Sequence, residues 1–378
     1  MSQQPINIVG AGIGGLTLGR CLLKRGIPAV LFDRAASAPR YSYGITLHAS
    51  SYQPLLKVLE IDERTFRKRV AVDGALEGNG VIDPKRLVQA GEVGPASFRA
   101  HRGKLEELLR EGLDVRWDHA LEKVEKMSNG VTLHFKNGQS IEHGHVVGAD
   151  GVHSETRKSL LPNIELKVLP FVAFNGKRRV KKSLFEELYA PAMRDSNIIE
   201  RRRNGTVMQI SINDSAADLV GISWVYSRVS KGSEDALYKP NRPTAGASDI
   251  PEEFFQEIES LTDLDQPFRE VFDRSNLEKE KILSWLMRTV DVGLSELQDL
   301  STKGVFFIGD AVHAQPIIGG EGANAALRDG MELADYIAGH GLDTAADWYK
   351  IKYSDWRNSV ERSERTIAEM HAESKSVL

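Results

Sequence analysis

Residues 6–34 read INIVGAGIGGLTLGRCLLKRGIPAVLFDR, and this stretch decides the fold. The apolar segment 6–9 predicts a short strand, residues 16–23 a helix that stops at Gly26, and residues 29–32 a second buried strand. Two strands joined by a helix form a right-handed β-α-β unit. We therefore expect an α/β protein built on a parallel, Rossmann-type sheet.

The turn between the first strand and the helix carries a G-x-G-x-x-G motif, formed by Gly10, Gly12 and Gly15. Glycines let the chain turn sharply there and bring backbone N–H groups and a helix N-terminus against a pyrophosphate. Asp33 ends the second strand, where a carboxylate can accept hydrogen bonds from a ribose. The motif predicts a bound dinucleotide but does not say which one. The alternative is a glycine-rich turn without a ligand.

Two further motifs follow apolar strands later in the chain. The first is GADGVHS at residues 148–154, and the second is GDAVH at residues 309–313, which leads to Pro316 and to GGEGAN at residues 319–324. Together with the glycine-rich turn they closely resemble the group A flavoprotein monooxygenases. This aromatic-hydroxylase family includes p-hydroxybenzoate hydroxylase, salicylate hydroxylase and the tetracycline-modifying TetX enzymes.

The resemblance implies FAD as a cofactor and gives each motif a role. Gly12, Gly14 and Gly15 would face the pyrophosphate, Asp33 the adenosine ribose and Arg34 the adenine. Arg102 would contact the flavin, Asp310 the ribityl chain or the phosphate, and Asp150 both FAD and NAD(P)H. The segment beside the flavin would comprise Pro316, Gly320, Gly322, Ala323 and Asn324. For Asp150 and Asp310 the alternative role is to cap a helix or turn.

Physical reasoning from the residues supports the roles near the flavin. The turn at 320–324 opens a helix that we expect from Glu321 to Ala338, and its positive end would favour the negative charge of reduced flavin. Pro316 presents an apolar face without an N–H. Glu321 stands where many relatives have glutamine, and Val312 where alanine is usual. His48 is either a substrate contact or a surface side chain.

The middle of the chain differs in pattern. From residue 165 to 287, short alternating runs suggest an antiparallel sheet, whose face near Phe171, Phe174, Met208, Gln209, Ile210 and Trp224 would form the floor of a substrate pocket. Residues 131–135 and 140–147 flank an Asn-Gly turn and predict a hairpin. We expect a discontinuous FAD-binding domain (1–70, 98–164 and 288–342), interrupted by a β-sheet substrate domain (71–97 and 165–287), and a C-terminal helix in 343–378.

Composition narrows the class of protein. The net charge of −4 gives no overall field to attract nucleic acid. A single cysteine, Cys21, excludes an intrachain disulfide and a CxxC redox pair. We expect no signal peptide, no membrane-spanning segment and no metal site, and a cytoplasmic location. The oligomeric state is open.

The resemblance implies an NAD(P)H-dependent FAD monooxygenase. It would hydroxylate or epoxidise an electron-rich aromatic or polycyclic small molecule with O2, through a flavin C4a-hydroperoxide. No residue identifies itself as a catalytic base, and the substrate cannot be predicted. The alternatives are an FAD-dependent dehydrogenase, reductase or cyclase on the same fold, and a non-catalytic relative such as the Rab-escort group.

Overall fold

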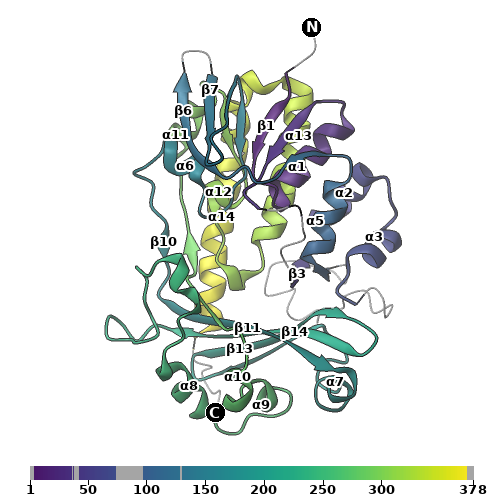
Figure 1. Ribbon diagram of the computed structural model, residues 1–378, viewed down its shortest axis with the longest axis vertical. Helices are drawn as coiled ribbons and strands as arrows, with labels where there is room; N and C mark the ends of the chain where they lie inside the picture. The colour runs from purple at the N-terminus through teal and green to yellow at the C-terminus, as the bar shows by residue number, and fades with distance from the viewer. Residues whose placement is uncertain (1–3, 36, 38–41, 74–96, 128–129, 373–378) are drawn as a thin grey trace.

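A parallel sheet forms one end of the molecule and an antiparallel sheet the other (Figure 1). The computed structural model describes residues 4–35, 37, 42–73, 97–127 and 130–372. Within them the parallel sheet has the strand order β17-β9-β1-β2-β5. The strands are β1 (Ile6–Val9), β2 (Ala29–Phe32), β5 (Asp114–Arg116), β9 (Val146–Gly148) and β17 (Val305–Phe307). The Rossmann-type α/β prediction is confirmed.

Helices and a small antiparallel sheet flank the parallel strands. The helices are α1 (Ile13–Lys24), α2 (Ala49–Leu59), α3 (Glu63–Val70), α5 (Arg102–Arg110), α6 (Glu155–Leu160), α11 (Leu294–Ser301), α12 (Asp310–His313) and α13 (Gly322–His340). The small sheet consists of β6 (Leu121–Met127), β7 (Gly130–Phe135) and β8 (Ser140–His143). Helix α13 lies so close to α1 that a Cβ at Gly330 would come within 2.8 Å of the Leu18 nitrogen.

One predicted strand is two strands. Residues 140–147 do not continue through one hairpin, because the chain bends at Gly144. Strand β8 pairs antiparallel with β7, whereas β9 pairs parallel with both β1 and β17. Residues 140–147 therefore contribute to two different sheets, and this places the 148–154 motif at the end of a central parallel strand.

The antiparallel sheet has the order β12-β13-β14-β11-β15. Its strands are β11 (Phe171–Lys181), β12 (Ile198–Arg203), β13 (Thr206–Ser215), β14 (Leu219–Val229) and β15 (Leu283–Trp285). One face packs on α7 (Lys182–Leu188), α8 (Glu252–Glu259), α9 (Phe268–Val271) and α10 (Arg274–Leu277), which lie below the sheet in Figure 1. The other face is turned toward the parallel-sheet end.

The expected pocket floor is largely wrong. Phe174, Met208, Ile210 and Trp224 are buried in the core that the sheet forms with α8–α10, on the face away from the parallel sheet. Side chains alternate along a strand, so a contiguous apolar run cannot lie on one face. The opposite face carries Phe171 and Gln209 of the expected floor, and it is mixed: polar Asn175, Ser211, Asn213 and Ser223 lie beside apolar Ala173, Val207, Val225 and Trp285.

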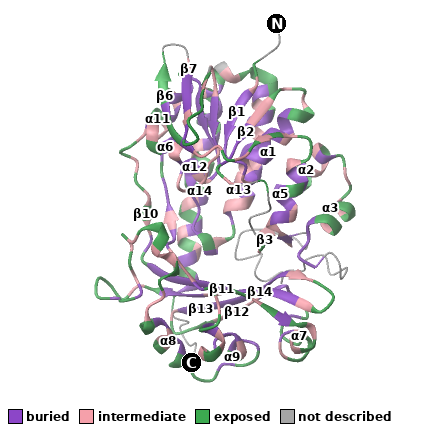
Figure 2. Ribbon diagram, in the orientation of Figure 1, coloured by how far each residue is buried: buried purple, intermediate pink, exposed green. Residues whose placement is uncertain are grey.

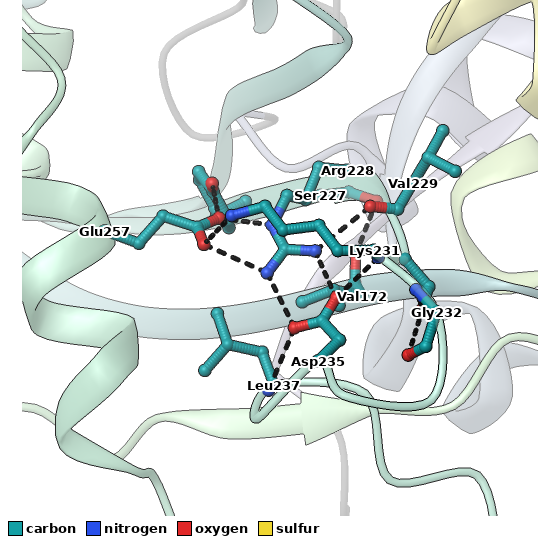
Figure 3. A network of polar contacts seen from close by, with 11 residues as sticks. Val172, Ser227, Arg228, Val229, Lys231, Gly232, Asp235, Leu237 and Glu257 are labelled. Carbon is teal, nitrogen blue, oxygen red and sulfur yellow. Dashed lines mark hydrogen bonds and ion pairs between the residues drawn. The ribbon is translucent and has the colours of Figure 1, made fainter.

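A buried ionic network joins β14 to α8 (Figure 3). Arg228 binds Asp235 through two hydrogen bonds of 2.6 and 3.0 Å and Glu257 through another of 2.9 Å. Lys231 donates to Glu257 at 3.0 Å. The Arg228 hydrogen bonds lower the pKa of Asp235 to about 2. Because every charge here is paired, the network fastens the loop after β14 to the helical layer.

The C-terminal helix of the prediction is α14 (Ala346–Met370), and it runs from the parallel-sheet end to the antiparallel sheet. Near its middle Trp356 donates to Asp329 of α13 at 2.9 Å. At its far end Ile367 packs with Phe171, and His371 contacts the Ser227 hydroxyl at 2.9 Å. The domain limits remain a prediction, and most of segment 71–97 lies outside the described residues.

The shorter elements connect these layers. They are β3 (Gly44–Leu47), β4 (Phe98–His101), β10 (Lys167–Val168), β16 (Arg288–Thr289), η2 (Thr244–Ser248), η3 (Ile317–Gly319) and η4 (Leu342–Thr344). None of the described helices is long and apolar enough to cross a membrane. Cys21 lies buried in α1, and burial raises the pKa of its thiol to about 12, so the thiol is inert at neutral pH.

Candidate functional site

Gly12, Gly14 and Gly15, the glycines expected to face the pyrophosphate, have different surroundings at the end of β1. A Cβ at Gly15 would lie 2.0 Å from the Gly10 oxygen, so Gly15 allows close packing of helix on turn. A Cβ at Gly14 would contact Ala326 of α13. Gly12 has nothing within 4 Å of its Cβ position, and it precedes the first turn of α1. This open position beside free helix N–H groups is where a phosphate can approach.

Asp33 is placed at the end of β2, as expected, and braces the glycine-rich turn. One carboxylate oxygen accepts the Ala11 N–H at 2.8 Å, and the other accepts the Ala35 N–H at 2.9 Å. The side chain is buried, whereas Arg34 beside it is exposed. Asp33 therefore holds the turn in shape, and contact with a ribose would be additional to that role.

Asp150 lies at the end of β9 and caps α6. Its carboxylate accepts the Ser154 hydroxyl at 2.5 Å and the Thr156 N–H and hydroxyl at 3.0 Å each. Arg157, which is almost fully buried, donates to the Ala311 oxygen at 2.6 Å. The second and third motifs are thus tied together by Arg157, a contact that the motifs alone did not reveal.

Asp310 lies at the start of α12 and faces the N-terminus of α13. A Cβ on Gly322 would stand 3.6 Å from its carboxylate oxygen. Burial raises the pKa of Asp310, while neighbouring groups that include His313 and Arg102 oppose the shift. A buried carboxyl group facing a helix start can hold a ligand hydroxyl, so the structure brings Asp310, Gly322 and Arg102 into one place.

Behind Asp310, His313 and Asp329 form a buried pair. His313 Nε2 lies 2.6 Å from the Asp329 carboxylate, which also accepts the Gly309 N–H at 2.8 Å. Burial raises the pKa of Asp329, but His313 and the hydrogen bonds outweigh it, so the pKa lies below the usual value. This geometry gives His313 a structural role beside Asp329.

Arg102 opens α5 and faces Tyr43, which the sequence analysis did not single out. The guanidinium donates to Glu106 at 2.8 Å and to the Tyr43 hydroxyl. Lys177 from the antiparallel sheet lies 4.8 Å from the centre of the same ring. Tyr43 therefore links α5 to the antiparallel sheet beside the site, at a place where no motif marks it.

Pro316 and the start of α13 form another side of the candidate site. Pro316 is buried, Gly320 is exposed with φ +77°, and Ala323 is half-buried. Asn324 is fully buried and binds β3: its side chain donates to the Thr46 oxygen at 3.0 Å and accepts the His48 N–H at 2.9 Å. Asn324 thus fixes α13 to β3, so its part in the site is to position backbone.

A second feature missed from the sequence is a contact between His48 and Glu321. His48 Nε2 lies 3.2 Å from a Glu321 carboxylate oxygen, and His48 Nδ1 lies 3.3 Å from the Ser97 hydroxyl. All three residues are buried (Figure 2 shows the buried regions). The available sequence signal was the glutamate at position 321, where many relatives have glutamine. Its partner His48 lies 273 positions earlier in the chain, so the sequence did not connect the two residues.

Polar contacts join β4 to the inner face of the antiparallel sheet. Arg99 donates to Ser211 of β13 at 3.2 Å and to Thr46 of β3 at 3.4 Å. The Gly44 N–H donates to Asn213 at 3.0 Å. These hydrogen-bonding groups lie between the two sheets, on the side of the antiparallel sheet that faces α13 and β3.

The arrangement fits FAD. The open glycine turn lies at the end of β1 and the start of α1. The Asp310 carboxyl group lies at the end of β17, and Arg102 on α5 is beside it. Residues 3–234 and 248–365 match the family described as FAD binding domain. The chain belongs to this family of flavoproteins. FAD is its cofactor, and the chain is an FAD-dependent monooxygenase, as the similar curated proteins are.

Among those relatives is the FAD-dependent monooxygenase nscC of Arthroderma benhamiae, which is 34% identical over 350 residues, 89% of this chain and 85% of the relative. The FAD-dependent monooxygenase adaC of Aspergillus niger is 32% identical over 387 residues, 97% of this chain and 93% of the relative. The flavoprotein aromatic-hydroxylase family expected from the three motifs is confirmed.

Solved structures share the fold. Tetracycline destructase Tet(55) superposes with a TM-score of 0.68 at 18% identity, over 100% of this chain and 90% of the other. The 2,6-dihydroxypyridine-3-hydroxylase of Arthrobacter nicotinovorans gives 0.64 at 18% identity, over 98% and 90%. At these identities the likeness concerns the fold alone.

Proposed function

We propose that this enzyme is an NAD(P)H-dependent monooxygenase that hydroxylates or epoxidises an electron-rich aromatic or polycyclic small molecule. The observation that carries the proposal is the meeting of the glycine turn, Arg102 and Asp310 with the start of α13, opposite a sheet face that includes polar groups such as Ser211 and Asn213, in a chain of this family. When bound and reduced, FAD would supply the chemistry that activates O2. The protein supplies binding, orientation and exclusion of water.

The residues divide the binding of FAD between them. The N–H groups that follow Gly12 bind the pyrophosphate, and Asp33 keeps their turn in shape while it faces the ribose. Asp310 accepts hydroxyl groups of the ribityl chain, and Arg102 lies against the flavin. Arg34 reaches the adenine. Support comes from the open space at Gly12 and from the placement of Asp310 against Gly322.

The flavin ring lies against the segment that starts at Pro316 and continues through Gly320, Gly322, Ala323 and Asn324. The helix start of α13 offers N–H groups to the pyrimidine, where negative charge develops on reduction. The buried Pro316 has no N–H and keeps that side apolar. Asn324 holds this helix start in position through its two contacts to β3 and His48.

The substrate lies between the flavin and the inner face of the antiparallel sheet. Arg99, Ser211 and Asn213 are hydrogen-bonding groups on that side. Such a surface suits a ring system that carries hydroxyl or carbonyl oxygens rather than a plain hydrocarbon, because buried polar groups need partners. Two solved neighbours are named for tetracycline and dihydroxypyridine, which agrees with an oxygen-bearing ring.

A group of cations supports the use of NAD(P)H. Burial lowers the pKa of His153, and nearby Arg288, Lys158 and Arg34 lower it further. These positive charges gather beside the turn that contains Asp150, which we expected to serve both nucleotides. The pyrophosphate of a second dinucleotide is the kind of polyanion that such a group attracts.

Turnover under ¹⁸O₂ tests the proposal. The enzyme is given NAD(P)H and candidate oxygen-bearing aromatic compounds, and those that accelerate NAD(P)H oxidation are analysed by mass spectrometry. One oxygen atom of the product should come from O2 and none from water. Unlabelled product formed together with stoichiometric NAD(P)H oxidation would instead indicate a dehydrogenase, reductase or cyclase.

A further inference from the structure

A cavity of about 340 Å³ lies between α14 and the paired strands β10 and β16. Its floor is apolar and consists of buried side chains at the edge of the main core: Val290, Val292, Val312 and Trp356. Tyr353 and Val360 of α14 form a half-buried wall. No step of the proposed reaction uses this cavity, and its volume lies at the lower end of the range for small-molecule sites.

The cavity is separate from the place proposed for the flavin. Helix α14 approaches the flavin segment through Gln315, whose side chain donates to the Ser359 hydroxyl at 3.2 Å and accepts the Ser363 hydroxyl at 2.6 Å. A different stripe of the same helix lines the cavity: Tyr353, Val360 and Glu364. Successive helical residues are rotated by about 100°, so the two stripes point in different directions.

Carboxylates outnumber cations around the cavity. The charged residues that line it are Glu165, Asp291, Glu361 and Glu364 on one side of the balance, and Lys167 and Arg357 on the other. Lys167 is paired with Glu364 at 2.7 Å, and Arg357 lies 3.5 Å from Glu361. His313, which also lines the cavity, is paired with Asp329. Four carboxylates against two cations leave a net charge of −2, and Glu165 has no ion-pair partner among the described residues.

We propose that this cavity is a second small-molecule site and that its ligand is an aromatic cation, a protonated arylalkylamine with one or two rings. The ring of the ligand packs on the apolar floor, where its burial removes apolar area from water. The ammonium group stays near the opening, where the excess of carboxylates attracts it. The Tyr353 ring in the wall offers an aromatic face to the same cation. An aromatic acid of the same size meets the same floor but is repelled by the negative charge.

Isothermal titration calorimetry on the FAD-loaded protein tests the proposal. Three probes share one ring system and differ in charge at neutral pH: tryptamine is a cation, tryptophol is neutral and indole-3-acetate is an anion. The titrations are made at low ionic strength, because salt screens the charges around the opening. We expect tryptamine to bind at one site with a dissociation constant below about 1 mM. Tryptophol should bind about fivefold more weakly or worse, and indole-3-acetate more weakly still.

Two variants locate the binding site. Val360→Trp places a large ring in the open space of the cavity and should abolish tryptamine binding, while the FAD content stays unchanged. Glu165→Gln removes one charge from the surface and should weaken tryptamine binding about two- to fivefold without affecting tryptophol. Glu186→Gln is the matched control, because Glu186 is an equally exposed glutamate on α7, on the far side of the antiparallel sheet. This variant should bind tryptamine as the unaltered protein does.

Three results would overturn the inference. The first is equal affinity for the three probes, or no saturable tryptamine binding. The second is tryptamine binding that persists in Val360→Trp, which would place the amine elsewhere, for example against the inner sheet face. The third is unchanged tryptamine affinity in Glu165→Gln, and this variant decides alone if Val360→Trp loses FAD. The titration needs no NAD(P)H, O2 or turnover, so its failure leaves the ¹⁸O₂ result standing, and a negative ¹⁸O₂ result leaves this measurement standing.

Discussion

Gly12→Val separates the binding of FAD from the folding of the chain. Gly12 has φ −86°, which any residue adopts, and its Cβ position has nothing within 4 Å. A valine there meets no protein atom at its Cβ but stands where the pyrophosphate must approach. We therefore expect a folded protein that no longer holds FAD.

The size of the effect follows from the contacts that are lost. Displacing the pyrophosphate breaks about two hydrogen bonds from N–H groups to a charged oxygen, each contributing about 1.5–3 kcal/mol. The sum of about 3–6 kcal/mol corresponds to affinity about 10²–10⁴-fold weaker. The change at the position before the helix costs folding about 1 kcal/mol or less. This shifts the melting temperature of the FAD-free protein by a few degrees at most.

The assay is a titration of FAD into the FAD-free protein, followed by quenching of flavin fluorescence, with thermal unfolding measured in parallel. Gly15→Ala is the contrasting variant, because its new Cβ would lie 2.0 Å from the Gly10 oxygen and must disturb the turn itself. It should lower the melting temperature of the FAD-free protein. If Gly12→Val binds FAD with unchanged affinity, the pyrophosphate does not lie at this turn and the reasoning is refuted.

Three further predictions concern other parts of the chain. Asp310→Ala should weaken FAD binding more than tenfold in the same titration, whereas Asp214→Ala on β13 should leave it within twofold; equal losses would count against the role of Asp310. Since Asp235 has a folded pKa of about 2, below the ordinary value near 3.9, it adds about 2 kcal/mol of stability above about pH 4 that is lost as the pH falls toward 2. Denaturant unfolding of Asp235→Asn should accordingly depend less on pH in that window, and an unchanged acid profile would argue against the pair. Acid precipitation should release all the yellow colour into the supernatant, and colour retained in the pellet would mean a covalent flavin.

Local patterns in the sequence were sufficient for the parallel-sheet end. The first β-α-β unit depends on neighbouring residues only, so the predicted strands at 6–9 and 29–32 agree with β1 and β2 to the residue. The break in 140–147 was missed because both β8 and β9 contain strand-forming residues, and the pattern does not say with which strands they pair.

Long-range contacts explain what the sequence did not reveal in the site. His48 and Glu321 are far apart in the chain and meet only because Asn324 fastens α13 to β3. The capping of α6 by Asp150 was weighed as an alternative, and the structure shows those hydrogen bonds directly. Helices α8–α10 cover one face of the antiparallel sheet and leave the other face turned toward the parallel-sheet end. The alternation of apolar and polar residues within one strand does not predict which face the helices cover.

Helix α14 has a consequence for how this enzyme could acquire a new substrate. Its 25 residues span about 37 Å as one rod, bound to Phe307 of β17 through Tyr349 near its start and to Ser227 through His371 just past its end. The continuous helix therefore holds the FAD-binding end and the antiparallel sheet at a fixed distance from each other. Evolution or engineering can replace side chains on the inner sheet face one at a time while α14 keeps the distance between the two sheets unchanged.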